Sequence, residues 1–464
     1  MRALKTRSIR LAITAAVAAA LGFTAATAFT AATAATVAAP AVGASAHRVA
    51  TTQPIPAITD HVLARSLAFP PDTAYCQQNL GISCYSPVQY QQAYNLKPLY
   101  KFGINGKGRT IAIVDAFGSP TIAADLHTFD QTYGLPDPPS LKIIQPAGTV
   151  PPFNNTDPVQ LNWAGETTLD VEYAHAIAPQ ANILLVETPV AETEGVTGFP
   201  EIVAAENYVI NHGLADVITQ SFGATENTFP SKQSLLDLRS AYVNADRHGV
   251  TVLASSGDTG VTNYNLDGSA LYPYPVNSWP SSDPLVTSIG GTQLHLDASG
   301  NRTAPDNVWN DGFGAGGGGL SQVFKRPEFQ NSVRSVVGGS RGTPDVSMSA
   351  AVDGAAIFYY TFDPSRIGWH LVGGTSEASP LFSGVVALTA QLARHRLGNI
   401  NSALYLLNKV HASGIVDVTT GDISFGGVTG PAAAPGYDLA SGVGTVNAAQ
   451  FVPQLALAGV FHRE

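Results

Sequence analysis

The sequence predicts an α/β fold in which a mainly parallel β-sheet is flanked by helices on both faces. Short aliphatic runs, typical of buried strands, alternate along the chain with longer segments of helical pattern. Strands separated by helices in this way form parallel sheets. The expected strands are 110–114, 181–186, 217–221 and 250–255, and the clearest expected helices are 166–178 and 201–211.

In an open sheet of this kind, ligands bind beyond the carboxyl ends of the strands. Asp115, Phe222 and Asp258 each fall just after a predicted strand. We therefore expect these three residues to lie near the functional site.

The N-terminal residues have the pattern of an export signal. Four basic residues surround the start of an apolar stretch, and Ala44-Ser45-Ala46 is a plausible cleavage site. The sequence thus predicts a secretory signal peptide over 1–46, a short N-terminal arm over 47–84 and a main domain over 85–464. The mature protein is expected to be secreted and extracellular. A retained membrane anchor is the alternative for the first segment.

The composition of the chain limits the classes of partner that it is expected to bind. The chain has 464 residues, enough for one large domain, and only 12% of them are charged. Without residues 1–46 it has 34 acidic against 20 basic residues, a formal charge of −14. Such an acidic chain is a poor partner for nucleic acid, and no later segment is long and apolar enough to span a bilayer. We expect a monomer without nucleic-acid binding or stable membrane association.

The two cysteines of the chain, Cys76 and Cys84, both lie in the predicted arm. In an exported protein such a pair favours a local disulfide. Two free thiols are the alternative, and the scarcity of soft ligands argues against a metal site at the cysteines.

The segment 372–380 is the most informative part of the chain. It reads Val-Gly-Gly-Thr-Ser-Glu-Ala-Ser-Pro and precedes an apolar, helix-like run to about residue 392. The glycines allow a tight turn, which would hold the hydroxyl of Ser376 near the free N–H groups of a helix start. Ser376 is therefore a candidate nucleophile, and a serine nucleophile needs a base.

The candidate base is a pair of carboxylates, Glu166 and Asp170. They lie four residues apart and share one face of the expected helix, whose apolar neighbours indicate burial. Two like charges held close tend to share a proton, which leaves one carboxylate as an acceptor. Taken alone, the pair could also be a solvated acidic face.

Three motifs together resemble the sedolisins, a family of serine-carboxyl peptidases with a subtilisin-like fold. They are the Gly-Thr-Ser-x-x-x-Pro segment around Ser376, the Glu-x-x-x-Asp helix that ends in Ala-His-Ala-Ile-Ala-Pro at 174–179, and Ala-Ser-Ser-Gly-Asp-Thr-Gly at 254–260. The sequence lacks the His-Gly-Thr-His segment that carries the subtilisin base. The resemblance runs from about residue 85 to the C-terminus, and it implies that 85–464 is a peptidase domain with protein or peptide substrates.

The resemblance implies a role for each motif. Ser376 attacks the peptide carbonyl, Glu166 accepts the serine proton, and Asp170 orients Glu166. A protonated Asp258 donates to the oxyanion, because an ionised carboxylate would repel it. Activity is then expected to be greatest at acid pH, where a carboxylate base still works and Asp258 is neutral.

Three nearby positions depart from the family pattern. Phe222 stands where the family has Trp, and we expect its ring, together with Gly257, to contact substrate. Asp115 stands where the family usually has Glu, so it either extends the catalytic network or is an ordinary strand-end aspartate. Glu377 follows the nucleophile where Ala is common, and we expect it to face outward in the first helical turn.

Two C-terminal segments, 415–419 and 434–438, resemble the calcium loops of the family. The resemblance implies one structural Ca²⁺, which prefers hard oxygen ligands. The implied ligands are the carboxylates of Asp417 and Asp438 and the backbone carbonyls of Val418, Ala434 and Gly436. Two unrelated loop aspartates are the alternative.

Two other functions remain open at this point. One is a histidine-based subtilisin-type peptidase with Asp115, His175 and Ser376 as its triad. The other is a catalytically inactive, exported binding protein on the same scaffold. The family is usually made with a large folded prosegment, for which the 38 residues of 47–84 are too few.

Overall fold

A computed structural model describes residues 66–458 of the chain. The predicted signal peptide (1–46) and the first part of the predicted arm lie outside the described residues. All described residues belong to one compact unit.

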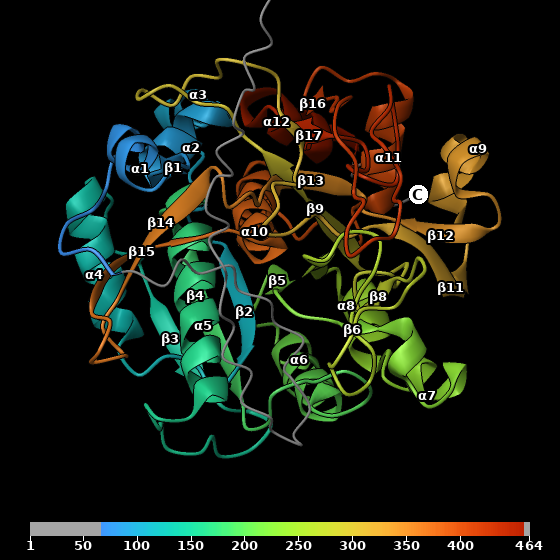
Figure 1. Cartoon of the computed structure of the whole chain (residues 1–464), viewed down its shortest axis with the longest axis horizontal. Helices are drawn as coiled ribbons and strands as arrows, with labels where there is room; N and C mark the ends of the chain where they lie inside the picture. The colour runs from blue at the N-terminus through green and yellow to red at the C-terminus, as the bar shows by residue number, and fades with distance from the viewer. Residues whose placement is uncertain (1–65, 459–464) are drawn as a thin grey trace, which may run out of the picture. The chain divides into compact units, whose positions relative to one another are not determined.

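The described residues contain a central, mainly parallel sheet, as the sequence predicts (Figure 1). Its strand order is β10-β9-β7-β5-β2-β4-β3, with β13 also paired to β9, and only the β9–β10 pairing is antiparallel. The four predicted strands are present. The strands are β2 (Thr110–Ala116), β3 (Leu141–Ile144), β4 (Asn182–Thr188), β5 (Val217–Gln220), β7 (Thr251–Ser255), β9 (Thr287–Gln293), β10 (Asn307–Val308) and β13 (Val346–Ser349).

Helices cover both faces of this sheet. Successive residues of a strand point to opposite faces, and along β2 Ile111 and Ile113 join one hydrophobic cluster while Ala112 and Val114 join another. The first cluster is completed by α5 (Pro158–Ile177) and α10 (Thr375–Ala393), which pack together (Figure 1). The second is completed by α6 (Phe199–Asn211) and α8 (Ser240–His248).

Helix α5 begins eight residues earlier than the sequence predicts. Asp157 caps it by accepting from the N–H of Val159 at 2.9 Å, and Pro158 occupies the first helical position. Every residue from Trp163 to Ile177 is buried. The helix approaches α10 closely, since a Cβ on Gly384 would lie 2.5 Å from the Cβ of Ile177. The two helices that carry the candidate catalytic residues are therefore held rigidly together.

The described end of the predicted arm, residues 66–84, packs into the same core as the domain. The predicted disulfide between Cys76 and Cys84 is confirmed. Helix α1 (Thr73–Asn79) leads into β1 (Cys84–Tyr85), which pairs in parallel with β14 (Ala355–Tyr360). Leu67 and Ile82 belong to the first hydrophobic cluster.

The remaining elements complete the flanks and the C-terminal region. They are α2 (Pro87–Ala93), α3 (Lys97–Lys101), α4 (Ile122–Tyr133), β6 (Ala224–Thr225), α7 (Lys232–Leu236), β8 (Ser278–Trp279), β11 (Gly319–Lys325), α9 (Arg334–Val337), β12 (Ser340–Thr343), β15 (Gly368–Val372), α11 (Asn401–Lys409), β16 (Ile415–Val416), β17 (Thr445–Val446) and α12 (Ala448–Ala458).

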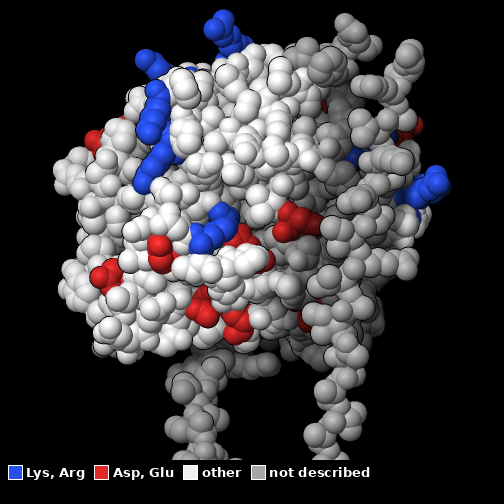
Figure 2. Space-filling view, turned by 90° about the horizontal axis from the view of Figure 1, so that it is seen from above, with Lys and Arg blue, Asp and Glu red and all other residues white. Residues whose placement is uncertain are grey.

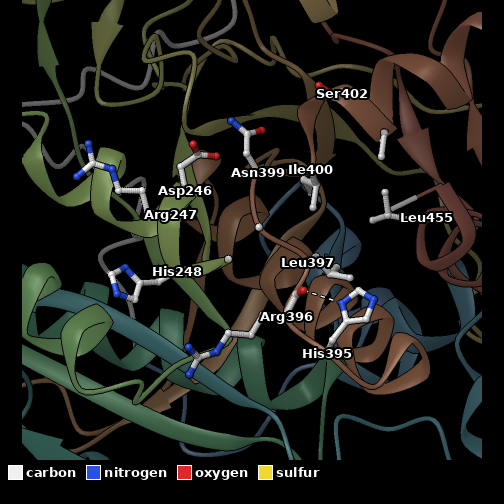
Figure 3. Close-up of a pocket in the computed structure, with 13 residues that line it drawn as sticks. Asp246, Arg247, His248, His395, Arg396, Leu397, Asn399, Ile400, Ser402 and Leu455 are labelled. Carbon is white, nitrogen blue, oxygen red and sulfur yellow. Dashed lines mark hydrogen bonds between the residues drawn. The ribbon is translucent and has the colours of Figure 1, made fainter. Parts of the chain in front are cut away.

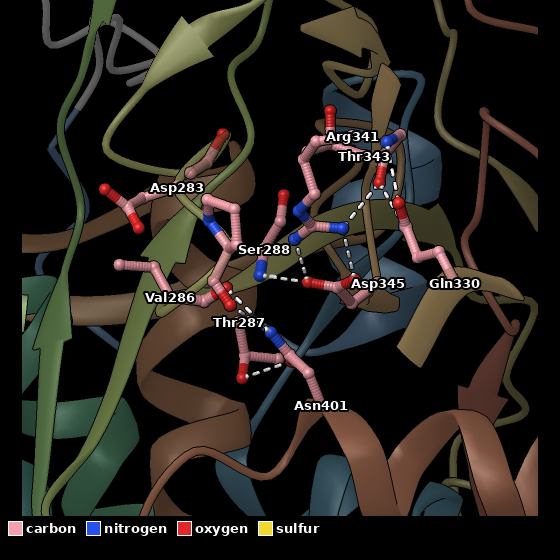
Figure 4. Close-up of polar contacts among 12 residues, drawn as sticks. Asp283, Val286, Thr287, Ser288, Gln330, Arg341, Thr343, Asp345 and Asn401 are labelled. Atoms are coloured by element: carbon pink, nitrogen blue, oxygen red, sulfur yellow. Dashed lines mark hydrogen bonds and ion pairs between the residues drawn. The ribbon is translucent and has the colours of Figure 1, made fainter. Parts of the chain in front are cut away.

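A buried ion pair joins the sheet to these C-terminal elements (Figure 4). Arg341, which has no exposed surface, forms a two-point contact with the carboxylate of Asp345. The same carboxylate accepts from the N–H of Ser288 on β9 at 2.8 Å and from the hydroxyl of Tyr405 on α11 at 2.9 Å. The side chain of Gln330 also belongs to this group, since it forms hydrogen bonds with the backbone of residue 342 and with the hydroxyl of Tyr405.

Few charges appear on the face drawn in Figure 2, where most atoms belong to uncharged residues. This agrees with a chain in which 12% of the residues are charged. Within residues 66–458 no helix has the length and apolar character needed to cross a membrane.

Candidate active site

The candidate catalytic residues gather at the carboxyl end of the parallel strands, as expected for an open sheet. Asp115 is the penultimate residue of β2, Phe222 follows β5, and Asp258 follows β7. Helix α10 begins at the same place, and Ser221, Gly257, Asp258 and Ser376 line one small cavity there.

The turn before α10 requires glycine. Gly374 has φ +149°, and a Cβ at this position would lie 2.7 Å from Oδ2 of Asp258. Any larger residue would therefore displace the Asp258 carboxyl group. The absence of a side chain at Gly374 lets Ser376, two residues later, and Asp258 share one wall of the cavity.

Pro380 explains the end of the Gly-Thr-Ser-x-x-x-Pro motif. Proline has no N–H, so inside α10 it cannot donate to the carbonyl four residues earlier, which is that of Ser376. The hydroxyl of Ser221 instead lies 3.4 Å from this carbonyl, and the hydroxyl of Ser376 lies 3.4 Å from the carbonyl of Ser221. The motif thus fixes the nucleophile against the end of β5.

Ser221 also connects the nucleophile with the acidic helix. Its hydroxyl donates to Oδ1 of Asp170 at 2.9 Å. Asp170 and Glu166 both have no exposed surface, and they lie one turn apart on α5. The solvated acidic face is therefore excluded. The sequence reasoning did not assign Ser221 a role, although its position at the end of a predicted strand was a signal for one.

Asp258 is held by the residue that precedes the nucleophile. Its Oδ1 accepts from both the N–H and the hydroxyl of Thr375, each at 2.7 Å. The Thr375 hydroxyl oxygen also accepts from the N–H of Gly257 at 3.1 Å. Because Oδ1 is occupied by these two donors, a proton on a neutral Asp258 would be on Oδ2.

Two expectations about side-chain direction need correction. The ring of Phe222 is 2% exposed and packs against Trp163 and Phe199 in the core, so only its backbone is available to line the cavity. The first turn of α10 is enclosed on all sides, and Glu377 therefore points inward, with no exposed surface. Its neighbours include the hydroxyls of Tyr90 and Ser349.

Two buried carboxyl groups, those of Glu377 and Glu194, form no ion pair with Lys, Arg or His within residues 66–458. Burial raises the pKa of Glu377 to about 8, and the hydroxyls of Tyr90 and Ser349 offset this only in part. Burial also raises the pKa of Glu194 to about 7, against the opposing effect of Thr225, which follows the Ser221 segment. These groups favour the neutral form, and their burial is not evident from the sequence because acidic residues are normally exposed.

The histidine alternative is not supported by the geometry. Nε2 of His175 lies 2.8 Å from the carbonyl of Pro136 and 3.2 Å from Oδ1 of Asp130. His175 is nine residues beyond Glu166 on α5, a distance of about 14 Å along the helix axis. It therefore packs toward α4 and away from Ser376.

The residues predicted to bind calcium come together in two adjacent loops. The N–H of Gly436 donates to Asp417 at 2.9 Å, and the N–H of Ala434 donates to Asp438 at 2.8 Å. The hydroxyl of Ser441 lies 3.5 Å from the carbonyl of Val418. No group of three His, Cys, Asp or Glu side chains suited to a metal occurs within 66–458. A cation here would rest on two carboxylates and on backbone carbonyls, which fits a hard ion such as Ca²⁺.

A larger hollow of about 550 Å³ lies at the opposite end of the same elements. It is formed by residues 246–249, just before β7, and 395–400, just after α10. Since α10 has 19 residues, this end lies about 27 Å from Ser376. The basic groups of Arg247, His248 and Arg396 point in different directions (Figure 3). The hollow thus has no convergent set of functional groups.

Comparison with known proteins agrees with this geometry. A sequence model of the subtilase family matches residues 145–416. Kumamolisin from Bacillus sp. (strain MN-32) is 30% identical over 71% of this chain and 56% of its own length. Tripeptidyl-peptidase 1 from Homo sapiens is 28% identical over 61% of this chain and 50% of its own length. The chain thus spans about half the length of these relatives.

A solved structure covers most of both chains. It is Pseudomonas sedolisin, a serine-carboxyl proteinase complexed with two molecules of pseudo-iodotyrostatin, which superimposes with a TM-score of 0.70 and 27% identity over 82% of this chain and 99% of that one. The family match and this structural match agree with the Ser376, Glu166 and Asp258 motifs. The chain therefore belongs to the subtilase family, in its sedolisin group with the subtilisin-like fold.

Proposed function

We propose that this chain is a secreted serine-carboxyl endopeptidase that hydrolyses peptide bonds in proteins at acid pH. The observation that carries the proposal is that Ser376 and Asp258 line one cavity, while Ser221 links Ser376 to Asp170 of the base pair. Ser376 contacts Ser221, Ser221 contacts Asp170, and Asp258 is anchored to the residue before the nucleophile. These are the groups that acyl transfer needs: a nucleophile, a base system and an oxyanion donor.

In the proposed reaction, Oγ of Ser376 attacks the carbonyl carbon and its proton moves to Glu166. The carbonyl oxygen becomes an oxyanion that accepts from the protonated Asp258 and from the N–H of Ser376. The tetrahedral intermediate then expels the amine, which takes the proton from Glu166 and leaves an acyl group on Ser376. Water repeats these steps and releases the acid. Asp170, fixed by Ser221, orients Glu166.

The proposal predicts a bell-shaped pH profile on the acid side. Activity is lost at low pH when the Glu166–Asp170 pair is fully protonated and no longer accepts the serine proton. It is lost at higher pH when Asp258 ionises and repels the oxyanion. Asp258→Asn keeps a donor at every pH, so its residual activity should extend upward. An optimum near pH 8 with a limb near about pH 6.5 would instead indicate a histidine base.

Digestion of a denatured protein over a pH series, with the product termini mapped, tests the whole proposal. Ser376→Ala should lower the rate by several orders of magnitude with the fold intact. Ser383→Ala is the matched control, because this buried serine on the same helix bonds only to the backbone of Pro380. Turnover in Ser376→Ala would remove Ser376 from the mechanism. A series of tripeptides from the substrate N-terminus would contradict endopeptidase action.

Two further parts of the proposal concern the protein outside the site. The predicted signal over 1–46 supports secretion, which N-terminal sequencing of protein from the culture medium would test. The loops around Asp417 and Asp438 support one structural Ca²⁺. Carboxylate and carbonyl oxygens from both loops would replace water molecules around the ion, and the ion would thereby link the two loops.

A further inference from the structure

The lining of the small cavity at Ser376 includes two polar residues, Asn263 and Ser278, that are called its floor here. Its walls include the backbone at Gly223 and Gly257. Its floor is formed by Asn263, which lies in the loop after β7, and Ser278 of β8. Neither floor residue was singled out by the sequence motifs.

The side chain of Asn263 has a fixed orientation. Its Oδ1 accepts from the N–H of Tyr264 at 2.8 Å and from the hydroxyl of Thr259 at 3.2 Å. Its Nδ2 therefore faces Ser278 and donates to the hydroxyl oxygen at 2.9 Å. The second Nδ2 hydrogen and the Ser278 hydroxyl proton are then the donors available to a group that enters the cavity.

Size and charge restrict what can enter. The cavity offers about 20 Å³ for the centre of a water molecule, and one ordered water needs roughly 10–15 Å³ on this measure. Among the residues that line it, Asp258 is the one ionisable group, and its Oδ1 is bound by Thr375. The floor therefore suits a side chain of very few atoms that is uncharged and accepts hydrogen bonds.

The cavity also faces one particular part of a substrate. A carbonyl carbon at Oγ of Ser376 with its oxygen at Asp258 places the side chain of the same residue at this cavity, which Gly257, Asn263 and Ser278 also line. This is the residue on the amino side of the bond that is cut. Its side chain would occupy the space next to Asn263 and Ser278.

We propose that Asn263 and Ser278 select serine at the amino side of the cleaved bond. The inference rests on the proposed peptidase function and specifies its substrate. A hydroxymethyl group fits the available space, and its oxygen can accept from the floor donors. An apolar group of the same size leaves these buried donors unpaired, and a larger group meets the floor.

Internally quenched peptides that differ only at this residue test the proposal, with kcat/KM measured at the acid optimum. The peptide with serine should be cleaved about fivefold faster than the one with alanine, as expected for one neutral hydrogen bond. The peptides with leucine and lysine should be at least about tenfold slower than the alanine peptide. Equal or faster cleavage after leucine would overturn the inference while leaving the peptidase function intact. Failure of the purified protein to cleave any peptide would overturn both.

Ser278→Ala tests the floor directly. It should bring the serine-to-alanine ratio of kcat/KM close to one, because the serine peptide loses the hydrogen bond that distinguishes it from the alanine peptide. Ser281→Ala is the matched control, since this buried serine donates to the backbone of Ser278 and does not line the cavity. It should keep the wild-type ratio. An unchanged ratio in Ser278→Ala, or an equal loss in Ser281→Ala, would contradict a role for the Ser278 hydroxyl.

Discussion

Two kinds of buried carboxyl group in this fold differ in the presence of a cationic partner. The carboxylate of Asp345 is paired with Arg341 and is surrounded by donors from β9 and α11. Within residues 66–458, Glu194, Glu206 and Glu377 form no ion pair with Lys, Arg or His, and burial raises the pKa of each.

The difference separates buried carboxylates that belong to an ion pair from buried carboxyl groups whose effect on stability depends on pH. A carboxylate in a buried ion pair is required by its partner, because its removal leaves an uncompensated buried charge. A buried carboxyl group without such a partner is stable only while it carries its proton. The Arg341–Asp345 ion pair therefore joins the sheet to the C-terminal elements. The buried carboxyl groups without a cationic partner make the folded state more stable at acid pH than at neutral pH.

The largest expected effect comes from breaking the pair. Asp345→Asn leaves the guanidinium of Arg341 buried without its counter-charge, which should reduce the free energy of unfolding by about 3–5 kcal/mol. Thermal melting at several pH values measures this loss. It should be similar at pH 4 and pH 7, because the guanidinium stays charged at both.

Glu377→Gln is the matched comparison, since it removes a carboxyl group of the unpaired kind from the same core. It should not destabilise the protein at pH 7. A loss as large as that of Asp345→Asn would show that the two kinds of carboxyl group do not differ as argued.

The second effect is a fall in stability as pH rises. Burial raises the pKa of Glu206 and Glu377 from 4.5 to about 8. The folded protein thus holds protons that the unfolded chain releases above about pH 4.5. The stabilisation is complete below that pH and is lost toward pH 8, by about 1.4 kcal/mol per pH unit for each group.

Glu206→Gln isolates one such group far from the site, on α6. Stability at pH 4 should change little, while at pH 7 the variant should gain up to about 3 kcal/mol over wild type. Melting temperatures across pH 4–8 give this difference. Parallel wild-type and variant curves would contradict the raised pKa.

The smallest effect concerns the proposed calcium ion, which would add a cation beside Asp417 and Asp438. A ligand that binds only the folded state stabilises it by mass action, by about 2.7 kcal/mol at one hundred times the dissociation constant. Melting curves with Ca²⁺ and with chelator should therefore differ. The difference should shrink in Asp417→Asn, which keeps an acceptor for the N–H of Gly436 but loses the charge. Identical wild-type curves would rule out the site.

The sequence by itself determined the fold class, and it was enough to propose the candidate catalytic residues. Aliphatic strands and helical segments alternate strongly enough to predict the parallel sheet, and β2, β4, β5 and β7 follow the predicted ranges to within a few residues. Ser376, Asp170 and Asp258 could be proposed from sequence because their motifs encode local geometry. The conformation of each motif is set by residues that are close in the sequence. The motifs are a glycine turn, a pair four residues apart on a helix and a loop at the end of a strand.

Only the tertiary structure decided which way side chains face and what surrounds them. Phe222 and Glu377 stand in recognisable motifs, yet both point into the core, because burial depends on α5, α6 and β13 segments distant in sequence. The link through Ser221 and the cavity floor at Asn263 and Ser278 likewise arise from separate strands meeting at one edge of the sheet. Local pattern specifies a residue's own backbone, whereas packing against remote elements sets its exposure, its pKa and its partners.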